Sequence, residues 1–185
     1  MAMTEILLDG SHDARQLRTA LGRFPTGVTI ITTCTGQGKL EGLTANSFAA
    51  LSLEPPLVLW SLSRKSASLD SFVQAGHFAI NVLGAAQASL SHQFATPRAH
   101  KFERAAFTPG LNGAPLLDGA LASFECSTEH SLDGGDHLLF VGRVRRIRYG
   151  HGDPLIFNAG SYCTTLPLRG ASAESDLNGI WAGLG

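Results

Sequence analysis

The hydrophobic pattern near the N-terminus is that of one amphipathic helix. Apolar residues recur there at helical spacing, at Leu17, Ala20, Leu21 and Phe24. Asp13, with Gln16 three residues later, resembles a capping box, a motif that begins many helices. Pro25 and Gly27 interrupt the pattern, so the helix is predicted to end before them.

The pattern then changes to segments rich in β-branched and aromatic residues, which are typical of strands. Strands are predicted over 26–35, 43–53, 57–62, 77–83, 120–130, 137–149 and 155–157. Helices are predicted over 66–74 and 85–95, a loop over 96–112, and hairpin connections over 36–38 and 132–136. Most connections are too short for parallel crossovers. We therefore predict a mainly β fold, an antiparallel barrel with two or three peripheral helices.

Length and composition indicate one domain. Of the 185 residues, 44% are hydrophobic and 16% are charged, which excludes a disordered chain and allows one substantial core. We expect a single domain over 1–170 and a C-terminal tail over 171–185. The large apolar residues of its last segment, 178–185, are Ile180, Trp181 and Leu184. Because chain ends are commonly mobile, we expect the tail to lie in solvent.

Charge and cysteine content exclude several classes of protein. The net charge of −1 provides no basic field for nucleic acid, and the arginines within 143–148 are interrupted by apolar residues. We interpret these arginines as the solvent face of a strand. No window approaches the ~20 apolar residues of a membrane span, and residues 1–8 lack the features of a signal peptide. Three dispersed cysteines suggest neither disulfides nor zinc, so we expect a cytoplasmic protein.

The familiar catalytic and nucleotide-binding motifs are missing. Gly36, Gly38 and Gly42 miss the spacing of the dinucleotide fingerprint and precede a predicted strand, where the fingerprint needs a helix. The sequence has no GxSxG motif, and its seven histidines show no HxH or HExxH spacing, so we expect no metal. The polar residues that remain are suited to hold a cofactor that itself carries the chemistry.

The first candidate among these polar residues is an anion site over 61–66, where a strand ends and a helix is predicted to begin. This segment contains Ser61, Ser63, Arg64, Lys65 and Ser66. Free backbone N–H groups and the helix dipole favour a phosphate at such a place. The alternative is structural: Ser66 caps the helix, and Arg64 and Lys65 are solvated.

The second candidate is the run Thr44, Ala45, Asn46 and Ser47. Asparagine is disfavoured in strands, and a buried amide is costly unless it is paired. An amide beside hydroxyls suits the edge of a polar heterocycle, which needs both donors and acceptors. A bulge or a strand end satisfied by backbone groups is the alternative.

The third candidate is His137, which follows Gly135 and Asp136 at the start of a long predicted strand. Histidine is well suited to hydrogen-bond a carboxamide or to move a proton near neutral pH. An ordinary turn residue is the alternative, and the local sequence does not decide between the two.

Taken together and in order, several segments resemble the short-chain flavin reductase family, the reductase components of two-component flavin-dependent monooxygenases. The matching segments are 24–30 (FPTGVTI), 42–48 (GLTANSF), 51–58 (LSLEPPLV), 78–83 (FAINVL), 101–102 (KF), 135–137 (GDH) and 154–155 (PL), with Ser66, Phe94, Gly160 and Tyr162. The resemblance runs from about residue 18 to about residue 166, most of the chain.

The resemblance implies a Greek-key split β-barrel, a homodimer with FMN (or FAD) bound near the interface, and one flavin reductase-like domain over 1–170. It implies that the isoalloxazine and ribityl chain are lined by Thr44, Ala45, Asn46 and Ser47, with Pro25, Thr26, Gly27 and Val28 close by. The implied phosphate site consists of Ser61, Ser63, Lys65 and Ser66. His137 is implied to lie near the flavin and the nicotinamide, and Asn81 and Tyr162 are carried over as cofactor-binding residues.

The implied function is hydride transfer from NADH or NADPH to flavin N5, with reduced flavin passing to a monooxygenase partner. No basic residue can be assigned to the extra phosphate of NADPH, so the preferred nicotinamide stays open. Two alternatives also stay open. One is a reductase of ferric iron or another acceptor that retains its FMN, and the other is a flavin-binding electron carrier without a nicotinamide site.

Overall fold

The computed structural model describes residues 3, 5–6, 14–97 and 100–166. The first helix, α1, spans Ala14–Leu21, as the apolar spacing predicts. Asp13, predicted to cap this helix, and the predicted tail over 171–185 lie outside the described residues.

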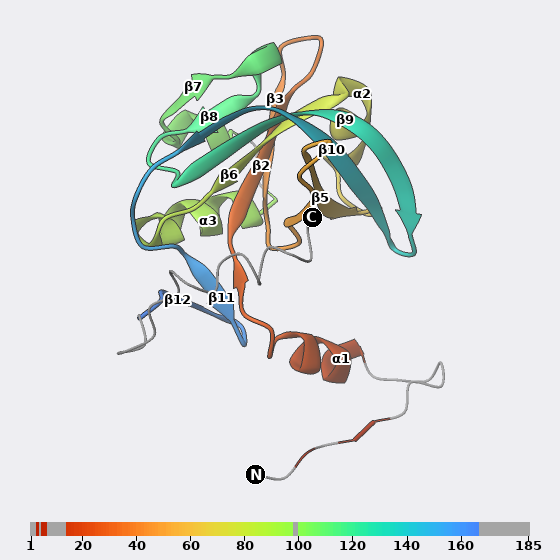
Figure 1. Ribbon diagram of the computed structural model, residues 1–185, viewed down its shortest axis with the longest axis vertical. Helices are drawn as coiled ribbons and strands as arrows, with labels where there is room; N and C mark the ends of the chain where they lie inside the picture. The colour runs from red at the N-terminus through yellow and green to blue at the C-terminus, as the bar shows by residue number, and fades with distance from the viewer. Residues whose placement is uncertain (1–2, 4, 7–13, 98–99, 167–185) are drawn as a thin grey trace.

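Strands make up most of the ordered structure (Figure 1). They are β1 (Thr26–Gly27), β2 (Thr29–Cys34), β3 (Leu40–Ala45), β4 (Ala49–Ser52), β5 (Leu57–Ser63), β6 (His77–Val82), β7 (Phe107–Pro109), β8 (Pro115–Leu117), β9 (Ala122–Gly134), β10 (His137–Tyr149), β11 (Ile156–Asn158) and β12 (Ser161–Cys163). The remaining helical elements are α2 (Leu69–Ala75), α3 (Ala88–Ala95) and the 3-10 turns η1 (Ala85–Gln87), η2 (Lys101–Arg104) and η3 (Leu111–Gly113).

One antiparallel sheet with the strand order β3-β2-β6-β9-β10-β5-β4 dominates the fold. The strands β3 and β4 are consecutive in the chain, yet they form the two opposite edges of this sheet. Only residues 46–48 connect them, so the sheet must curl until its edges nearly meet. The result is a barrel that is split between β3 and β4, and the prediction of an antiparallel barrel is confirmed.

The main core fills the inside of this barrel with packed aromatic rings. In β5, Val58, Trp60 and Leu62 are buried, as the two-residue period of a strand requires. Trp60 stacks on Phe140 of β10 with ring centroids 4.6 Å apart. The same period turns Ser61 and Ser63 to the other face of β5, away from the aromatic core.

A second cluster forms where α3 and the small sheet β1-β11-β12 meet the barrel. Its buried members are Val28, Ile30, Leu83, Phe94, Leu117 and Leu155. Figure 1 shows α1 set apart from the main sheet, and none of its described residues is buried. Most of the apolar stripe of this helix is therefore exposed, since Leu17 is half-buried and Ala20, Leu21 and Phe24 are exposed.

The predicted strand over 26–35 is interrupted at Val28, because its two ends serve different sheets. β1 pairs with β11, whereas β2 pairs with β3 and β6. Between them, the Val28 N–H donates to the Leu155 carbonyl (3.1 Å), and the Val28 carbonyl accepts from the Leu83 N–H (2.9 Å). β-branched composition predicts extended backbone but not the partner of each part.

Three further differences concern sequence that is weakly patterned. The predicted strand over 43–53 is divided into β3 and β4 by the crossing at 46–48. The predicted loop over 96–112 contains η2 and β7, and β7 pairs with β8. β9 extends through Gly134, so the predicted connection over 132–136 shortens to a tight turn, and β12 was not predicted at all.

Candidate functional site

The run 44–47 lies at the split of the barrel and is fastened to β5. The Ser47 hydroxyl accepts a hydrogen bond from the Ser61 N–H (3.0 Å) and donates one to the Ser61 carbonyl (3.2 Å). At the end of β3, the Thr29 hydroxyl donates to the Ala45 carbonyl (2.8 Å). Side chains therefore hold both ends of the crossing between the two sheet edges: Thr29 bonds its start at Ala45, and Ser47 bonds its end to Ser61 of β5.

Asn46 occupies the middle of this crossing and is exposed. The prediction that Asn46 lies within a strand is wrong, because the residue follows the last position of β3 and is exposed. Its side-chain N–H donates to the Thr26 hydroxyl (3.2 Å), which links the crossing to β1. The alternative of a strand end describes the backbone correctly.

The register between β5 and β10 brings two predicted groups together. His137 is the cross-strand partner of Ser63, and Leu139 is the partner of Ser61. Directly opposite residues in an antiparallel pair have Cβ atoms only about 5 Å apart and lie on the same face. The start of β10 therefore stands beside the end of β5, the strand to which Ser47 is bonded at Ser61.

The segment over 63–66 is a turn and not a helix start. α2 begins at Leu69, so Ser66 is not the residue that caps it, and both alternatives placed the helix too early. The Lys65 N–H donates to the Ser63 hydroxyl (3.3 Å), and the Ser68 N–H donates to the Ser66 hydroxyl (3.3 Å). Lys65 is exposed and forms no ion pair within the described residues.

His137 forms a close pair with the residue before it. Its Nδ1 lies 2.7 Å from the Asp136 Oδ1, and the imidazole is 43% exposed. The hydrogen bond from His137, together with its charge when protonated, holds the pKa of Asp136 below the ordinary value. A neutral imidazole that donates from Nδ1 to this carboxylate leaves Nε2 as an acceptor for a ligand.

The residues predicted around 25–28 have mixed environments. Pro25 and Gly27 are exposed and Thr26 is half-buried, so these three can be reached from the split. Val28 is buried, and its side chain belongs to the second core cluster. Only the backbone around Val28 borders the site.

Tyr162 is connected to the site by a residue that the sequence did not single out. Its hydroxyl lies 2.8 Å from the hydroxyl of Ser91, which is fully buried on α3. The Ser91 carbonyl in turn accepts a hydrogen bond from the Thr44 hydroxyl (2.6 Å). The sequence could have indicated Ser91 as a serine among apolar helix positions. Its partners Thr44 and Tyr162 come from distant segments, so its role could not be predicted.

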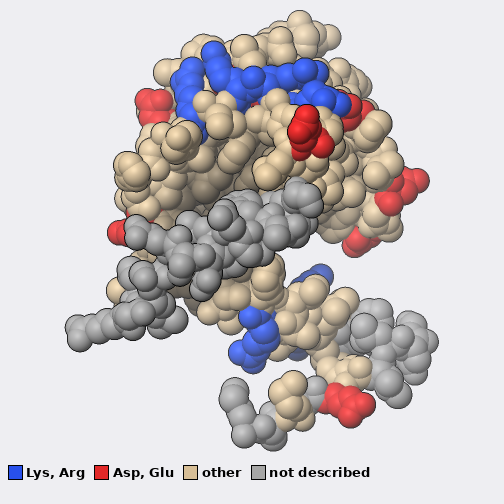
Figure 2. All heavy atoms as spheres, viewed as in Figure 1, with Lys and Arg blue, Asp and Glu red and all other residues tan. Residues whose placement is uncertain are grey.

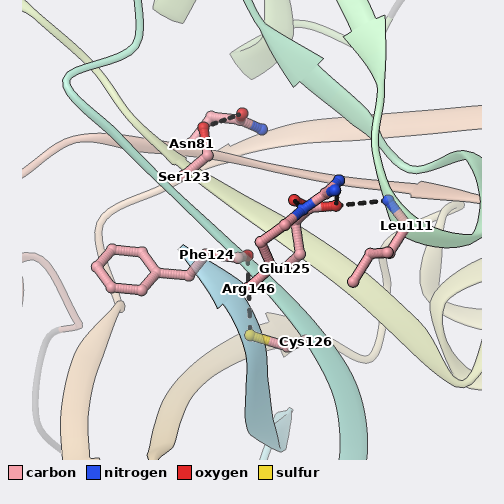
Figure 3. Close-up of polar contacts among 7 residues, drawn as sticks. All are labelled: Asn81, Leu111, Ser123, Phe124, Glu125, Cys126 and Arg146. Carbon is pink, nitrogen blue, oxygen red and sulfur yellow. Dashed lines mark hydrogen bonds and ion pairs between the residues drawn. The ribbon is translucent and has the colours of Figure 1, made fainter. Parts of the chain in front are cut away.

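Asn81 does not join the other predicted residues. It is fully buried in β6, and its amide N–H groups donate to the carbonyls of Ile30 and Pro115. Its Oδ1 accepts from the Leu117 N–H (3.0 Å) and from the Ser123 hydroxyl (3.1 Å), the latter drawn in Figure 3. All hydrogen-bonding positions of this amide have internal partners, so a role for Asn81 in flavin binding finds no support.

Sequence reasoning also missed a buried carboxylate. Glu125 is 2% exposed, and it accepts hydrogen bonds from the Arg146 guanidinium and from the Leu111 N–H (Figure 3). Burial by itself raises the pKa of Glu125, but the hydrogen bonds from Arg146 and Leu111 and the charges of Arg146 and Arg148 outweigh it. The pKa of this carboxyl is therefore lowered. The pair fastens η3 to β9 and β10.

The arginines within 143–148 form part of the basic band that Figure 2 shows along β10. Arg145, Arg146 and Arg148 are exposed, which confirms their interpretation as a solvent face. The band is partly neutralised, because Arg143 pairs with Glu129 (2.6 Å) and Arg146 pairs with Glu125.

The candidate site is an open surface of the single chain. One hollow of about 480 Å³ lies beside α3 and η2, but its lining contains none of the predicted site residues. Within the described residues, no three metal-ligating side chains gather at one point. The helices described there are all too short and too polar to cross a bilayer.

The donor set at the split fits a flavin. Hydroxyls, one exposed amide and a lysine without an ion pair among the described residues suit a polar heterocycle, its hydroxylated chain and a phosphate. An antiparallel split barrel with such groups at its opening defines a class of cofactor-binding barrels. The chain belongs to the flavin reductase like domain family, whose model matches residues 21–166.

Characterised relatives and solved structures share this fold. The chain is 42% identical over 162 residues to the FMN reductase (NADH) SmoA of Agrobacterium fabrum, covering 88% of this chain and 92% of that protein. It is 39% identical to the reductase component of the flavin-dependent trigonelline monooxygenase of Acinetobacter baylyi, covering 85% of this chain and 51% of that protein. The NADH:FAD oxidoreductase SgcE6 of Streptomyces globisporus, solved with NAD and FAD fragments, superposes with a TM-score of 0.82 at 34% identity, covering 88% and 98% of the two chains.

Proposed function

We propose that this chain is an NADH:flavin oxidoreductase that reduces FMN or FAD and supplies reduced flavin to a monooxygenase. The observation that carries the proposal is the register that puts His137 opposite Ser63, beside the crossing at 44–47. The relatives named as an NADH-dependent FMN reductase and as a monooxygenase reductase component support it. The preferred nicotinamide is taken from these names, because the described residues of the site offer no assigned contact to a 2′-phosphate.

The proposed flavin site divides into three parts. Thr44, Ala45, Asn46 and Ser47, with Pro25, Thr26 and Gly27, contact the heterocycle and ribityl chain. The phosphate is bound by Ser61, Ser63, Lys65 and Ser66. Tyr162 acts through Ser91 on Thr44 and closes the far side of the site. When bound, the flavin supplies the redox chemistry by accepting the hydride, and the protein supplies binding and orientation.

His137 is the residue that we assign to the nicotinamide. Asp136 keeps the proton on Nδ1, so Nε2 is available to accept a hydrogen bond from a carboxamide. Such a contact would hold the nicotinamide ring over the flavin. Holding two reacting groups in the geometry of the reaction supplies much of the rate enhancement of a transfer reaction.

A second copy of the chain is proposed to cover the open site. Large apolar side chains are exposed on elements next to it: Leu21 is 65%, Phe24 76% and Leu53 60% exposed. The mostly exposed stripe of α1 belongs to the same surface. Burying such groups in a homodimer is favourable and would add a wall to the flavin site. We also propose that the protein is cytoplasmic, consistent with its free cysteines Cys34, Cys126 and Cys163.

The test is anaerobic reduction of the flavin-loaded protein. We expect added NADH to bleach the visible flavin band and to be consumed, both with bound flavin and with added FMN in turnover. A band that neither NADH nor NADPH bleaches would contradict the proposal and favour an electron carrier. Turnover only with ferric iron or a dye, and none with free flavin, would favour a bound-flavin reductase.

The role of His137 is tested by His137→Ala. Because a lost hydrogen bond at a positioned site costs on the order of 1–3 kcal/mol, we expect kcat/KM for NADH to fall roughly 5- to 150-fold. The matched control is His151→Ala, an exposed histidine beyond the opposite end of β10, which should leave the rate unchanged. Equal rates for both variants would remove His137 from the mechanism.

A further inference from the structure

Arg64 lies between Ser63 and Lys65 in the proposed phosphate segment, yet its contacts lead elsewhere. Its backbone N–H donates to the Asp136 carbonyl (2.9 Å), and its Nε donates to the Gly135 carbonyl (3.2 Å). Its guanidinium also forms an ion pair with the Asp133 carboxylate. All three contacts are to the turn over 133–136, which consists of the last two residues of β9 and the two residues that join β9 to β10.

The β9–β10 ladder pairs Asp133 with Leu138 and Gly134 with His137, and only Gly135 and Asp136 of this segment lie outside it. Residues 131–136 are all exposed, and β10 begins only at His137. Gly135 has a φ of +73°, a conformation that glycine adopts without strain and that adds no stiffness to the turn. The ladder between β5 and β10 ends at the pair of His137 and Ser63, so Arg64 contributes the next contacts beyond it.

We propose that Arg64 is a positioning residue, which clamps the turn over 133–136 and thereby sets the place of His137 relative to the phosphate segment. The proposal rests on the proposed function, in which His137 serves the nicotinamide and Ser63 with Lys65 serves the flavin phosphate. One side chain then keeps the two ligand sites at a fixed separation. The side chain of Asp136 is the partner of the His137 imidazole, and the backbone carbonyl of Asp136 accepts a hydrogen bond from the Arg64 N–H.

The contacts of Arg64 restrict the orientation of the turn over 133–136 and contribute little to the free energy of unfolding of the whole protein. The Asp133 side chain is 87% exposed and that of Arg64 is 43% exposed, so this ion pair is screened by water and salt. A guanidinium is nevertheless planar and rigid, and two contacts from one fork restrict the orientation of the turn. Small misplacements of a reacting group can cost up to about 100-fold in rate.

Two variants separate the clamp from a direct contact with ligand. Arg64→Ala removes both side-chain contacts, whereas Asp133→Ala removes the ion pair and leaves the cation in place. Arg143→Ala is the control, because it breaks the comparable ion pair with Glu129 on the same two strands, away from the turn. Arg64→Lys keeps the charge but loses the fork, so it should rescue the Asp133 contact only in part.

The first readout needs neither flavin nor turnover. Hydrogen–deuterium exchange of the ligand-free protein should be roughly 3- to 10-fold faster over 131–138 in Arg64→Ala and in Asp133→Ala, because each loses at least one hydrogen bond or ion pair. Exchange over 120–130 in Arg64→Ala, and over 131–138 in Arg143→Ala, should match the wild type. Unchanged exchange at the turn in Arg64→Ala would overturn the clamp, whatever the protein catalyses.

The second readout is kinetic. We expect Arg64→Ala and Asp133→Ala both to lower kcat/KM for NADH roughly 3- to 30-fold while the Kd of FMN changes less than about 2-fold. A large rise in the FMN Kd for Arg64→Ala alone would mean a direct phosphate contact and would overturn the proposal. If His137→Ala is impaired while both clamp variants are normal, the proposed function stands and the clamp fails. If the wild type does not oxidise NADH, the proposed function fails and hydrogen exchange alone decides the clamp.

Discussion

At the scale of single residues, Glu125 shows how a charge can be buried at low cost. The carboxylate is almost inaccessible, but it accepts from a guanidinium and from a backbone N–H, and its partner Arg146 keeps a solvated side. Buried charges are tolerated only when they are paired and hydrogen-bonded in this way. The sequence offered no hint, because a glutamate on an alternating strand is expected to face solvent.

Glu125→Gln tests the importance of that pairing. The glutamine amide carries no charge to neutralise Arg146, and its NH2 group replaces one acceptor oxygen with a donor. The free energy of unfolding should therefore fall by about 1–3 kcal/mol, which is less than the loss when a fully buried ion pair is broken. Urea unfolding followed by fluorescence measures it. The matched control is Glu129→Gln, which removes a carboxylate from a more exposed arginine pair and should have a much smaller effect. Equal losses would mean that burial of Glu125 has no energetic importance.

The same carboxyl should make stability depend on acidity. Its pKa is lowered in the folded protein, against about 4.3 for a free glutamate, so its contribution is complete above pH ~4.3 and is lost as the pH falls toward the folded value. The stability difference between wild type and Glu125→Gln should therefore be constant from neutral pH to about pH 5 and shrink below pH 4. Urea midpoints at a series of pH values give the comparison, and a difference that grows on acidification would contradict the assignment.

At the scale of elements, Asn81 joins β6 to the strands around it. The hydrogen bonds of its side-chain amide reach β2 at Ile30, β8 at Pro115 and Leu117, and β9 at Ser123. Four strands therefore depend on one side chain in the interior. A role of this kind explains an asparagine in a buried strand without any ligand.

Asn81→Ala distinguishes that role from flavin binding. Removing the amide leaves buried donors and acceptors unsatisfied, so the free energy of unfolding should fall by roughly 2–4 kcal/mol. Well below the unfolding temperature, the Kd of FMN should stay within about 2-fold of the wild type, because the loss acts on folding and not on the site. The control is Asn158→Ala, an exposed asparagine of β11. A large rise in the FMN Kd of the folded variant would restore Asn81 to the flavin site.

Element types followed from local pattern, whereas their boundaries at the site did not. The period in β5 predicts which residues are buried, and the helices near 66–74 and 85–95 were found with shifted ends. The crossing at 46–48 could not be predicted, because it is imposed by the closure of the sheet and not by Asn46 itself. The same holds for α2, which begins after the turn that Ser63 and Ser66 stabilise.

At the scale of the whole molecule, the resemblance of ordered segments gave the fold, and the sheet register gave the site. No local pattern states that His137 stands opposite Ser63, since β5 and β10 lie far apart in the sequence and pair only in the folded sheet. The clamp by Arg64 was likewise invisible, because the sequence placed this residue among phosphate ligands. Residue types at the site could be predicted, but their partners required the three-dimensional structure.

The exposed apolar surface beside the site leads to the last prediction, which concerns assembly. If a second copy covers α1 and the split, the protein should sediment as a dimer, and FMN should bind more weakly at concentrations where the dimer dissociates. Leu21→Lys places a charge on the apolar stripe, and a cation near a helix C-terminus does not itself destabilise the helix.

We expect this variant to shift the dimer toward monomer and to raise the Kd of FMN at least about 10-fold, because buried charges at an interface are strongly unfavourable and the covering wall is lost. Tyr149→Lys, at an 81% exposed position at the far end of β10, is the control and should leave both properties unchanged. Sedimentation velocity and flavin fluorescence titration on the same samples make the comparison. A Leu21→Lys monomer that binds FMN like the wild type would show that one subunit holds the complete flavin site.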